Sequence, residues 1–358
     1  MTLRNKKSLL FIGPDYHCSF FYRDRLRKNG WKSDILVSST YPQNLLYSNE
    51  GVLKLADFSD SGIFLRSLGV ILGYFYYFRL IIKYKYHFYY DGFEYFNYGI
   101  EKKLNLEPFQ LHLWVAKILG VKIILFPSGC SSEFTKEEFS KFDKGNVCNN
   151  CGYKTCNDKI NKARLSIAEK YADLVLGFGT FDSPHFKISS LKYKSLDLSV
   201  FKPDIKIPKN LKLSRTKNIR ILHSFYDVNR THDGKNIKGS PYIVDAVKRL
   251  QREGFNVEYM NFRDISSNTM RYYQAQADIV VEQLIYGWWG STGVEAMGLG
   301  KPLVCYLRLS WKKFFLERYP NYTNLPVIEA DTSSIYVCLL YTSPSPRDAT
   351  LSRMPSSA

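Results

Sequence analysis

The feature that most constrains the fold of this chain is the regular alternation of strand-like and helix-like segments in both of its halves. Short segments of strand character occur at 8–12, 34–37, 86–90, 121–126, 173–176, 219–223, 256–260 and 278–281. Segments of helical composition lie between them at 20–28, 108–119, 159–171, 240–254 and 270–276. Strands that alternate with helices of this length form parallel sheets covered by helices on both faces. The sequence therefore predicts an α/β fold.

The chain is long enough to form two such domains. It has 358 residues, and its hydrophobic content of 45% and charged content of 23% are those of a globular protein. A junction near 197–203, followed by a lysine-rich and weakly patterned stretch, separates the two halves. We therefore predict a first domain over 1–200 and a second domain over 201–337.

The last residues of the chain, 338–358, do not continue the pattern of either domain. The runs from Cys338 to Asp348 and from Ser352 to Ala358 look like the translation of a sequencing adapter, an index and a primer. We interpret 338–358 as a non-native tail and leave it out of the reasoning about the fold. This interpretation implies that the natural protein is truncated near Val337 and that the second domain is incomplete.

A glycine-rich stretch in the second half has the layout of an anion-binding site. Residues 278–281 read as a buried strand, the next glycines as a flexible loop, and Thr292 as the start of a helix. The N–H groups and the dipole at a helix N-terminus favour a negatively charged ligand. The candidate diphosphate-binding residues are Gly290, Ser291, Thr292 and Gly293.

Glu295 lies one turn into this helix and has two interpretations. Its carboxylate could reach a ribose hydroxyl beside the bound diphosphate. Thr292-x-x-Glu295 is also the pattern of a capping box, in which the glutamate bonds back to the helix N-terminus. The concentration of glycine, serine and threonine between Gly287 and Gly293 favours the ligand-binding interpretation.

The run Glu-Ala-Met-Gly-Leu-Gly-Lys-Pro from Glu295 to Pro302 resembles the donor-sugar site of the retaining family 4 glycosyltransferases. The resemblance implies the GT-B fold, in which two Rossmann-like domains with parallel sheets face each other across a cleft. It also implies that the second domain holds a nucleoside diphosphate sugar and that the first domain holds the acceptor. The resemblance is specific only over about 219–307.

The same resemblance assigns cations to the donor diphosphate. In the family, a basic residue in the loop after the first strand of the second domain and the lysine of a Lys-Gly pair neutralise this group. Arg230 and Lys238 match these two positions. A leaving nucleoside diphosphate gains negative charge as the glycosidic bond breaks, so such cations stabilise the transition state more than the ground state. Each residue could instead be a solvated loop cation.

The sequence departs from the family in its glutamates and histidines. The family usually has two glutamates with seven residues between them, and the first falls on Gly287 here, whereas Glu282 lies five residues earlier and is a candidate substitute. No catalytic base is assigned, because the leaving phosphate can accept the acceptor's proton. His17 and His87 are the catalytic candidates, and for both a packing or surface role is the alternative.

Four cysteines in the first half have a spacing that can bind a metal. Cys148, Cys151 and Cys156 follow the pattern Cys-x2-Cys-x4-Cys, and Cys130 is a fourth thiol upstream. Such a set can close a tetrahedral zinc site, which here would be a structural knuckle and not part of the chemistry. Free buried thiols and redox chemistry are the alternatives. We expect the reaction itself to need no cofactor.

The formal charge of +17 is divided between the halves and favours anionic partners. Nucleic acid is not expected, since no basic stripe or binding motif is present.

No signal peptide is visible, because 1–7 lead directly into a strand-like segment. The apolar segment 67–78 is too short to span a bilayer and reads as a core helix, with an interfacial helix as the alternative. We expect a cytoplasmic protein that can be peripheral at the inner membrane face.

These observations predict a retaining glycosyltransferase that moves a sugar from a nucleoside diphosphate donor to a glycan or a lipid-linked acceptor. Two alternatives remain open at this point. One is a nucleotide-sugar epimerase of the 2-epimerase type on the same scaffold. The other is a non-catalytic module that binds a sugar nucleotide or a glycan, which the glycine at position 287 makes conceivable.

Overall fold

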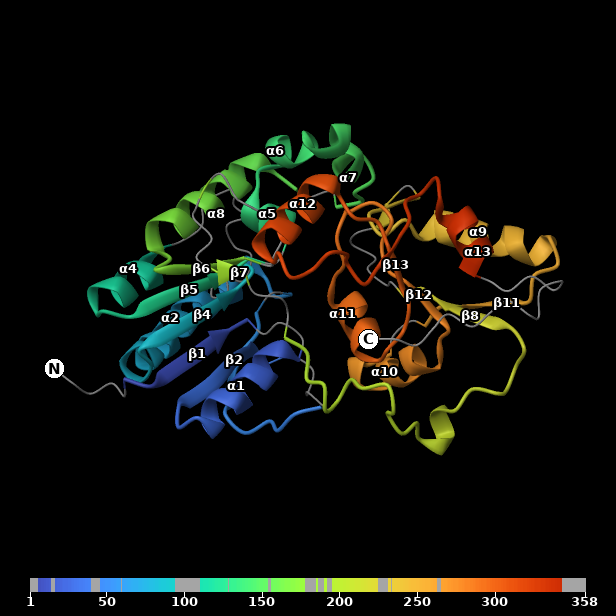
Figure 1. Cartoon of the computed structure of the whole chain (residues 1–358). Helices are drawn as coiled ribbons and strands as arrows, with labels where there is room; N and C mark the ends of the chain where they lie inside the picture. The colour runs from blue at the N-terminus through green and yellow to red at the C-terminus, as the bar shows by residue number, and fades with distance from the viewer. Residues whose placement is uncertain are drawn as a thin grey trace. The chain divides into compact units, whose positions relative to one another are not determined.

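The structure is a computed structural model, and it divides the chain into two compact units (Figure 1). Unit 1 contains 1–141 and 155–195, and unit 2 contains 142–154 and 196–358. The short segment 142–154, which lies inside the predicted first domain, therefore belongs to unit 2. The described residues are 6–13, 17–39, 46–58, 60–93, 110–127, 129–153, 156–177, 185, 190–191, 195–224, 231–232, 234–262 and 265–342.

Unit 1 is built on a parallel sheet of seven strands in the order β3-β2-β1-β4-β5-β6-β7. The central pairing is in register, with Ile12 of β1 opposite Leu36 of β2 and Tyr89 of β4. The strands are β1 Ser8–Ile12, β2 Lys32–Ser38, β3 Val52–Leu55, β4 Tyr86–Tyr90, β5 Lys122–Phe126, β6 Leu174–Gly177 and β7 Ser190–Leu191.

Helices cover both faces of this sheet because successive strand residues point to opposite sides. Phe11 of β1 packs on one face with Phe20 of α1. On the other face, His87 and Tyr89 of β4 contact Tyr77 of α2. The helices of unit 1 are α1 Cys18–Lys28, α2 Ile63–Lys83, α4 Leu111–Ile118, α5 Cys130–Glu133, α6 Lys136–Ser140 and α8 Asp158–Tyr171.

Unit 2 repeats the architecture with a parallel sheet of five strands in the order β11-β8-β12-β13-β14. These strands are β8 Ile219–Leu222, β11 Val257–Met260, β12 Ile279–Val281, β13 Leu303–Cys305 and β14 Ile328–Glu329. A two-stranded hairpin, β9 Thr231–His232 and β10 Lys235–Asn236, follows β8. The helical elements are α7 Asn146–Asn149, α9 Ser240–Arg252, α10 Ser267–Gln276, α11 Ser291–Gly298, α12 Leu309–Arg318 and α13 Ile335–Thr342, with short 3-10 turns at Phe142–Gly145 and Lys209–Leu211.

The end of unit 2 includes part of the predicted non-native tail. Helix α13 extends to Thr342, and the Leu339 side chain is fully buried in the same core cluster as Ile243 and Leu250 of α9. The first residues of the tail therefore complete a helix against α9. Residues 343–358 lie outside the described part of the chain.

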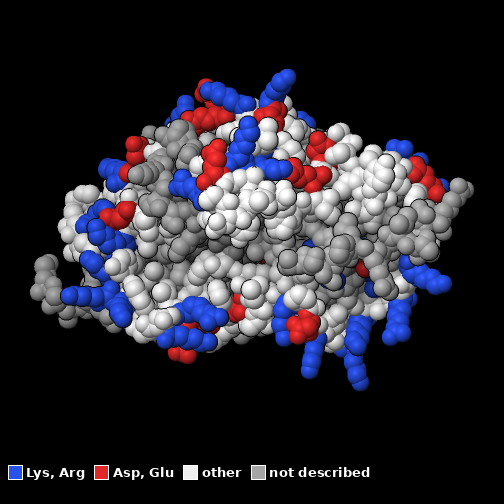
Figure 2. Space-filling model, in the orientation of Figure 1, with Lys and Arg blue, Asp and Glu red and all other residues white. Residues whose placement is uncertain are grey.

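The charged side chains on the face in Figure 2 are distributed and not gathered in one stripe. Lys and Arg project at several edges of this face, and Asp and Glu lie among them. This distribution agrees with the spread of the +17 formal charge along the sequence.

Candidate functional site

The candidate site lies at the carboxyl edge of the unit 2 sheet, where the strand order reverses. The chain leaves β8 towards β11 on one side and returns to β12 on the other side of β8. Open α/β sheets bind their ligands at such a switch point, beyond the carboxyl ends of the strands. Two polar residues occupy it, since His223 directly follows β8 and Glu282 directly follows β12.

Lys238 and Glu282 form an ion pair at this edge. The Lys238 Nζ lies 3.1 Å from Oε1 of Glu282, and the side chains are 17% and 3% exposed, respectively. The Lys238 backbone is fixed as well, because its N–H donates to Asn236 Oδ1 at 2.7 Å and its carbonyl accepts from Leu284 at 3.1 Å. The structure thus brings together two of the predicted donor-binding residues.

The Glu282 carboxylate also lies at the N-terminus of α11. The Gly290 N–H points at both carboxylate oxygens, at 2.8 Å and 2.7 Å. A Cβ at Gly290 would lie 2.7 Å from Oε1 of Glu282, and one at Gly293 would lie 2.6 Å from Oε2. The sequence predicted that these glycines bring the backbone close to a ligand, whereas the group that they approach here is the internal carboxylate of Glu282.

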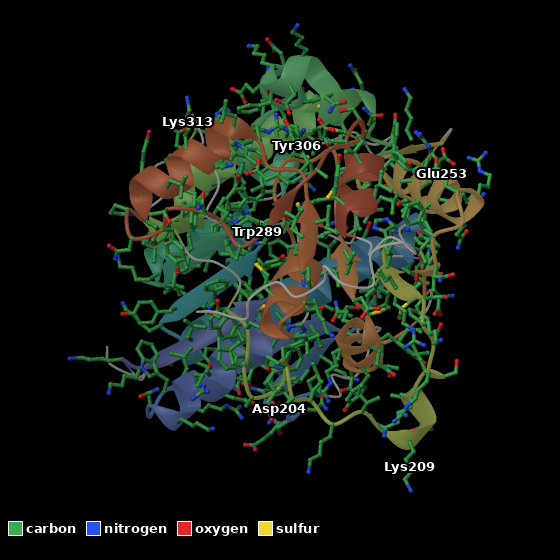
Figure 3. All side chains as sticks on the ribbon, turned by 45° about the vertical axis from the view of Figure 1, so that its right-hand side comes forward. Asp204, Lys209, Glu253, Trp289, Tyr306 and Lys313 are labelled. Carbon is green, nitrogen blue, oxygen red and sulfur yellow. The ribbon has the colours of Figure 1, made fainter. Side chains whose placement is uncertain are left out.

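Aromatic packing holds the loop between β12 and α11 in place. Trp288 and Trp289 stack with their ring centroids 4.1 Å apart, and both are buried. Trp289 is 4% exposed, whereas Lys209 and Glu253 extend at the margin of the view in Figure 3. The loop is therefore a packed part of unit 2 and presents α11 in a defined position.

Glu295 does not form the capping box that was the alternative interpretation. The N-cap of α11 is Gly290, without a side-chain cap, so the helix begins at Ser291 and not at Thr292 as predicted. Glu295 instead accepts a hydrogen bond from Gln274 Nε2 of α10 at 3.0 Å, and its side chain is only partly buried. Gln274 of α10 therefore orients the Glu295 carboxylate, and Glu295 itself lies one turn into α11.

Position 287 cannot hold the first glutamate of the resembled family in this conformation. Gly287 has a φ of +97°, and a Cβ there would lie 2.8 Å from the Cβ of Arg308. Arg308 donates its backbone N–H to the Gly287 carbonyl at 2.8 Å and its Nη2 to the Tyr286 carbonyl at 3.0 Å. The sequence reasoning missed Arg308, because nothing near it in the sequence indicates this contact.

Arg308 also anchors the segment 142–154 within unit 2. Its Nη1 lies 3.1 Å from Asp143 Oδ2, which also accepts from the Tyr306 hydroxyl at 2.8 Å. The guanidinium carbon lies 4.6 Å from the ring centroid of Trp311 and 5.1 Å from that of Phe142. Asp143 adopts a left-handed φ of 47°, a conformation that a non-glycine residue keeps only when surrounding contacts hold it. The ion pair supplies such contacts.

His223 is a neutral structural residue in this arrangement. Its Nδ1 donates to the Val281 carbonyl at 2.9 Å, and its Nε2 therefore accepts from the Ser240 hydroxyl at 2.7 Å. Burial, with the nearby Lys238 charge, lowers the pKa of His223 to about 4. The N-cap of the following helix, α9, is Gly239, and Ser240 is already helical.

The two candidate histidines of unit 1 are both buried. His87 is fully buried, and its Nδ1 lies 2.8 Å from the Tyr77 hydroxyl in the aromatic layer between β4 and α2. This environment favours the packing role for His87. His17 precedes α1 at its N-cap without a side-chain cap bond, and is 3% exposed. Arg230, the second predicted cation of the diphosphate site, lies outside the described residues.

The predicted zinc knuckle is not supported. The part of the chain that the structure describes contains no group of three or more His, Cys, Asp or Glu side chains that could hold a metal ion. Cys130 and Cys156 belong to unit 1, whereas Cys148 and Cys151 belong to unit 2, and none of these four described residues forms a disulfide. The spacing in the sequence was compatible with zinc, but the fold divides the four thiols between different units.

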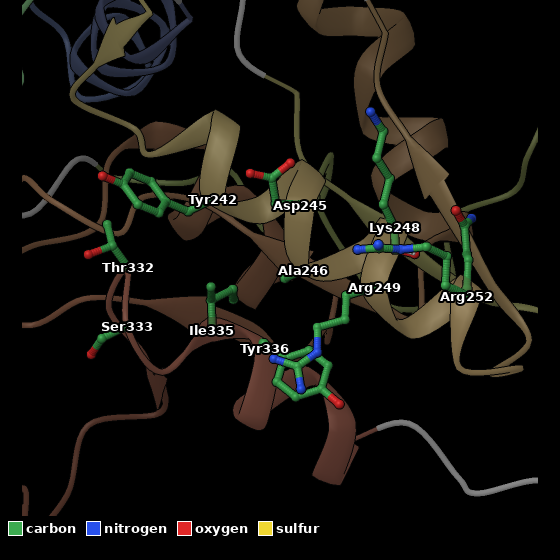
Figure 4. Close-up of a pocket in the computed structure, with 11 residues that line it drawn as sticks. Tyr242, Asp245, Ala246, Lys248, Arg249, Arg252, Thr332, Ser333, Ile335 and Tyr336 are labelled. Atoms are coloured by element: carbon green, nitrogen blue, oxygen red, sulfur yellow. Dashed lines mark hydrogen bonds between the residues drawn. The ribbon is translucent and has the colours of Figure 1, made fainter.

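A separate surface pocket of about 860 Å³ lies between α9 and α13 (Figure 4). Arg249 crosses it, with its guanidinium 3.6 Å from the ring centroid of Tyr336 and its Nε donating to Glu253 at 2.9 Å. None of the predicted donor-binding residues lines this pocket. It is therefore distinct from the site at the switch point.

Comparisons with known proteins identify the fold. No protein-family model and no curated protein sequence matches the chain. Among solved structures, sucrose-phosphate synthase from Thermosynechococcus elongatus is similar, with a TM-score of 0.53, 12% identity and coverage of 94% of this chain and 89% of that one. A putative UDP-N-acetylglucosamine 2-epimerase from Listeria monocytogenes has a TM-score of 0.52, 9% identity and coverage of 94% and 87%.

A third similar structure is S. aureus TarM, in a complex with fondaparinux, α-GlcNAc-glycerol and UDP. Its TM-score is 0.52 at 8% identity, with coverage of 94% of this chain and 92% of that one. At such low identity the likeness concerns the fold and not the activity. The two parallel sheets, each flanked by helices, together with these neighbours show that the chain has the α/β architecture of the GT-B fold.

Proposed function

We propose that this protein is a glycosyltransferase that uses a nucleoside diphosphate sugar, with the donor diphosphate bound at the carboxyl edge of the unit 2 sheet. The observation that carries the proposal is the convergence of Lys238, Glu282 and the N-terminus of α11 at the switch point. Structures with the same fold support it, including S. aureus TarM in complex with UDP and an E. coli protein bound with UDP-2-fluoro glucose.

The charges of the site suit a diphosphate if Lys238 binds the Glu282 carboxylate and a phosphate oxygen at the same time. Glu282 is almost fully buried and needs a cation, whereas the Lys238 side chain keeps 17% exposure beside it. An ammonium group has three donors, so Lys238 can keep its bond to Glu282 and donate to a phosphate oxygen. The N–H groups of the first turn of α11 add further donors. We assign Arg230 as the second cation and Glu295 as the ligand of the ribose hydroxyls.

The proposed reaction proceeds with retention at the anomeric carbon. The acceptor oxygen forms the new bond to this carbon as the bond to the diphosphate breaks, and the acceptor proton passes to the leaving phosphate. No side-chain base is needed on this route. Lys238 and the helix N-terminus then stabilise the charge that develops on the diphosphate, which makes their interaction stronger in the transition state than in the ground state.

We further propose that the acceptor is a glycan or a lipid-linked saccharide that binds unit 1, and that the protein is cytoplasmic and peripheral at the inner membrane face. The basic charge of +17 and the aromatic content of 16% support a partner that is anionic and carries sugar rings. Nucleic acid is not among the proposed partners.

Calorimetry with UDP, GDP and other nucleoside diphosphates tests the donor site. Lys238→Ala should weaken binding by about tenfold, the equivalent of one charge-assisted hydrogen bond. Lys313→Ala, a change of the same kind at an exposed position on α12, should leave the affinity unchanged. If no nucleoside diphosphate binds to the wild-type protein, the proposal is wrong.

Product analysis with nucleotide sugars then distinguishes the activities. Transfer to an acceptor or slow hydrolysis, with the anomeric configuration retained in NMR spectra, supports the proposal. Release of an epimerised sugar without an acceptor would instead identify the epimerase alternative, for which the L. monocytogenes structure is a neighbour of the same fold. Binding of the nucleotide sugar without turnover would indicate a binding module.

A further inference from the structure

Exposed apolar side chains are concentrated on two neighbouring helices of unit 1. Of the nineteen large hydrophobic residues that are exposed in the described part of the chain, eight lie on α2 and four lie on or directly after α4. Phe64 is 78% exposed, Phe75 is 65% exposed and Trp114 is 54% exposed. Apolar residues on the surface are ordinary when scattered singly, but a continuous patch marks a site of interaction.

Four of the exposed residues of α2 form one row along the helix. Phe64, Leu68, Ile71 and Phe75 recur at spacings of four and three, which places them on a single face. Leu111, Trp114 and Ile118 repeat this pattern on α4. The two helices contact each other through Tyr74 and His112, whose rings are 5.4 Å apart in a T-shaped pair. We call the surface that both rows present the α2–α4 face.

The opposite side of α2 is fixed to the sheet. Tyr77 is fully buried, and its hydroxyl lies 2.8 Å from His87 Nδ1 and 2.7 Å from the Tyr89 hydroxyl. Gly69 faces Phe58 so closely that a Cβ there would lie 2.3 Å from its ring. By length and composition α2 is, in the described residues, the one helix apolar enough to cross a membrane, with a mean hydropathy of 1.3. Crossing would break the buried hydrogen bonds of Tyr77, so we expect α2 to lie along a surface.

The charges near the α2–α4 face decide which partner fits it. The sequences of α2 and α4 contain no Asp or Glu. Arg79 follows Phe75 by four residues on the same row and is exposed, as is Lys83 at the end of the helix. A second copy of the chain would bring the same cations against each other. An anionic lipid surface instead accepts the apolar row among its acyl chains and the cations among its headgroups.

We propose that the α2–α4 face docks on an anionic lipid bilayer, with α2 parallel to its plane. The sequence favoured a core helix over 67–78, whereas α2 is apolar on its outward face as well as on its inward face. The inference identifies the surface that makes the membrane contact and does not depend on the nucleotide site in unit 2. Its success or failure can therefore be separated from that of the proposed activity.

Vesicle flotation tests this docking. Vesicles of 70% phosphatidylcholine and 30% phosphatidylglycerol are compared with vesicles of phosphatidylcholine alone. Phe75→Glu should lower the partition coefficient on anionic vesicles by at least about tenfold, because a charge enters the apolar row. Arg79→Gln should lower it by about fivefold on anionic vesicles and leave weak binding to neutral vesicles unchanged.

The control is Leu198→Glu, at an apolar residue that is 66% exposed in unit 2, which should change the partition coefficient less than twofold. An unchanged melting temperature and an unchanged circular dichroism spectrum of Phe75→Glu show that the variant is folded. The inference fails if the wild-type protein does not float with anionic vesicles or if Phe75→Glu floats equally well. It also fails if sedimentation shows a dimer that Phe75→Glu dissociates, because a second copy then covers the face.

Discussion

The ion pair between Lys238 and Glu282 offers the sharpest test of the site. Replacing one partner of a buried ion pair costs about 3–5 kcal/mol, because the other charge stays buried. Glu282 is 3% exposed, but it keeps the Gly290 N–H as a donor. Lys238→Met should therefore lower the free energy of unfolding by about 3 kcal/mol, the lower end of that range. Glu282→Gln leaves Lys238 within reach of water and should cost about 1.5 kcal/mol.

The two substitutions should not be additive. When both charges are removed, no charge stays buried, so the double variant should lose less than Lys238→Met alone, about 1.5 kcal/mol, and not the sum of about 4.5 kcal/mol. The coupling energy is then about 3 kcal/mol. The effects on UDP binding should have opposite signs. Lys238→Met removes a cation from the phosphate site, whereas Glu282→Gln removes an anion and should strengthen binding.

Urea unfolding followed by tryptophan fluorescence measures these energies, since the stacked Trp288 and Trp289 lie on the loop that follows Glu282. The control is the same cycle on Lys312 and Glu329, an ion pair of unit 2 whose side chains are 30% and 45% exposed. Its coupling should be about 0.2–1 kcal/mol. A coupling between Lys238 and Glu282 no larger than this control, or weaker UDP binding by Glu282→Gln, would refute the reasoning.

Three further predictions concern the surroundings of the site. Burial lowers the pKa of His223 from 6.5 to about 4, so its stabilising contribution is complete above about pH 6.5 and is lost as the pH falls towards 4. This loss should reach about 3 kcal/mol at 1.36 kcal/mol per pKa unit, and His223→Asn should flatten the pH dependence of the unfolding free energy by that amount. Gly293→Ala should lower the free energy of unfolding by about 1–2 kcal/mol, and with it the melting temperature, because overpacking against Glu282 exceeds the gain in helix propensity. An equal or higher melting temperature would contradict the contact. Arg308→Met should lower the unfolding free energy by about 2–3 kcal/mol and speed tryptic cleavage within 142–154. Adding Asp143→Asn should recover part of this loss in the same urea assay, whereas a substitution at an unrelated position should recover none of it.

The sequence predicted the elements with strong periodic patterns closely. The expected strands at 8–12 and 86–90 coincide with β1 and β4, and the expected helix at 159–171 differs from α8 by one residue. These patterns are local, because a strand or a helix repeats its apolar positions within a few residues. The ends of helices were less well predicted. Helix α11 begins at Ser291 after the glycine cap Gly290, whereas the sequence predicted a start at Thr292.

Residues far apart in the sequence were brought together in ways that no pattern indicated. The Tyr306 hydroxyl donates to Asp143 across 163 residues, and Arg308 shares that partner. The fold also distributes the four clustered cysteines over two units, although their spacing fits a metal site. Spacing along the chain limits what a loop can reach, but only the folded backbone decides which side chains meet.

The sequence by itself therefore determined the parallel α/β architecture and the location of the glycine-rich loop between β12 and α11, since both follow from short-range periodicity and backbone preference. Only the tertiary structure decided that the Glu282 carboxylate rests on Gly290 and pairs with Lys238. That choice depends on burial, because a carboxylate removed from water must find a cation and N–H donors within hydrogen-bonding distance, and these come from segments that meet only after folding.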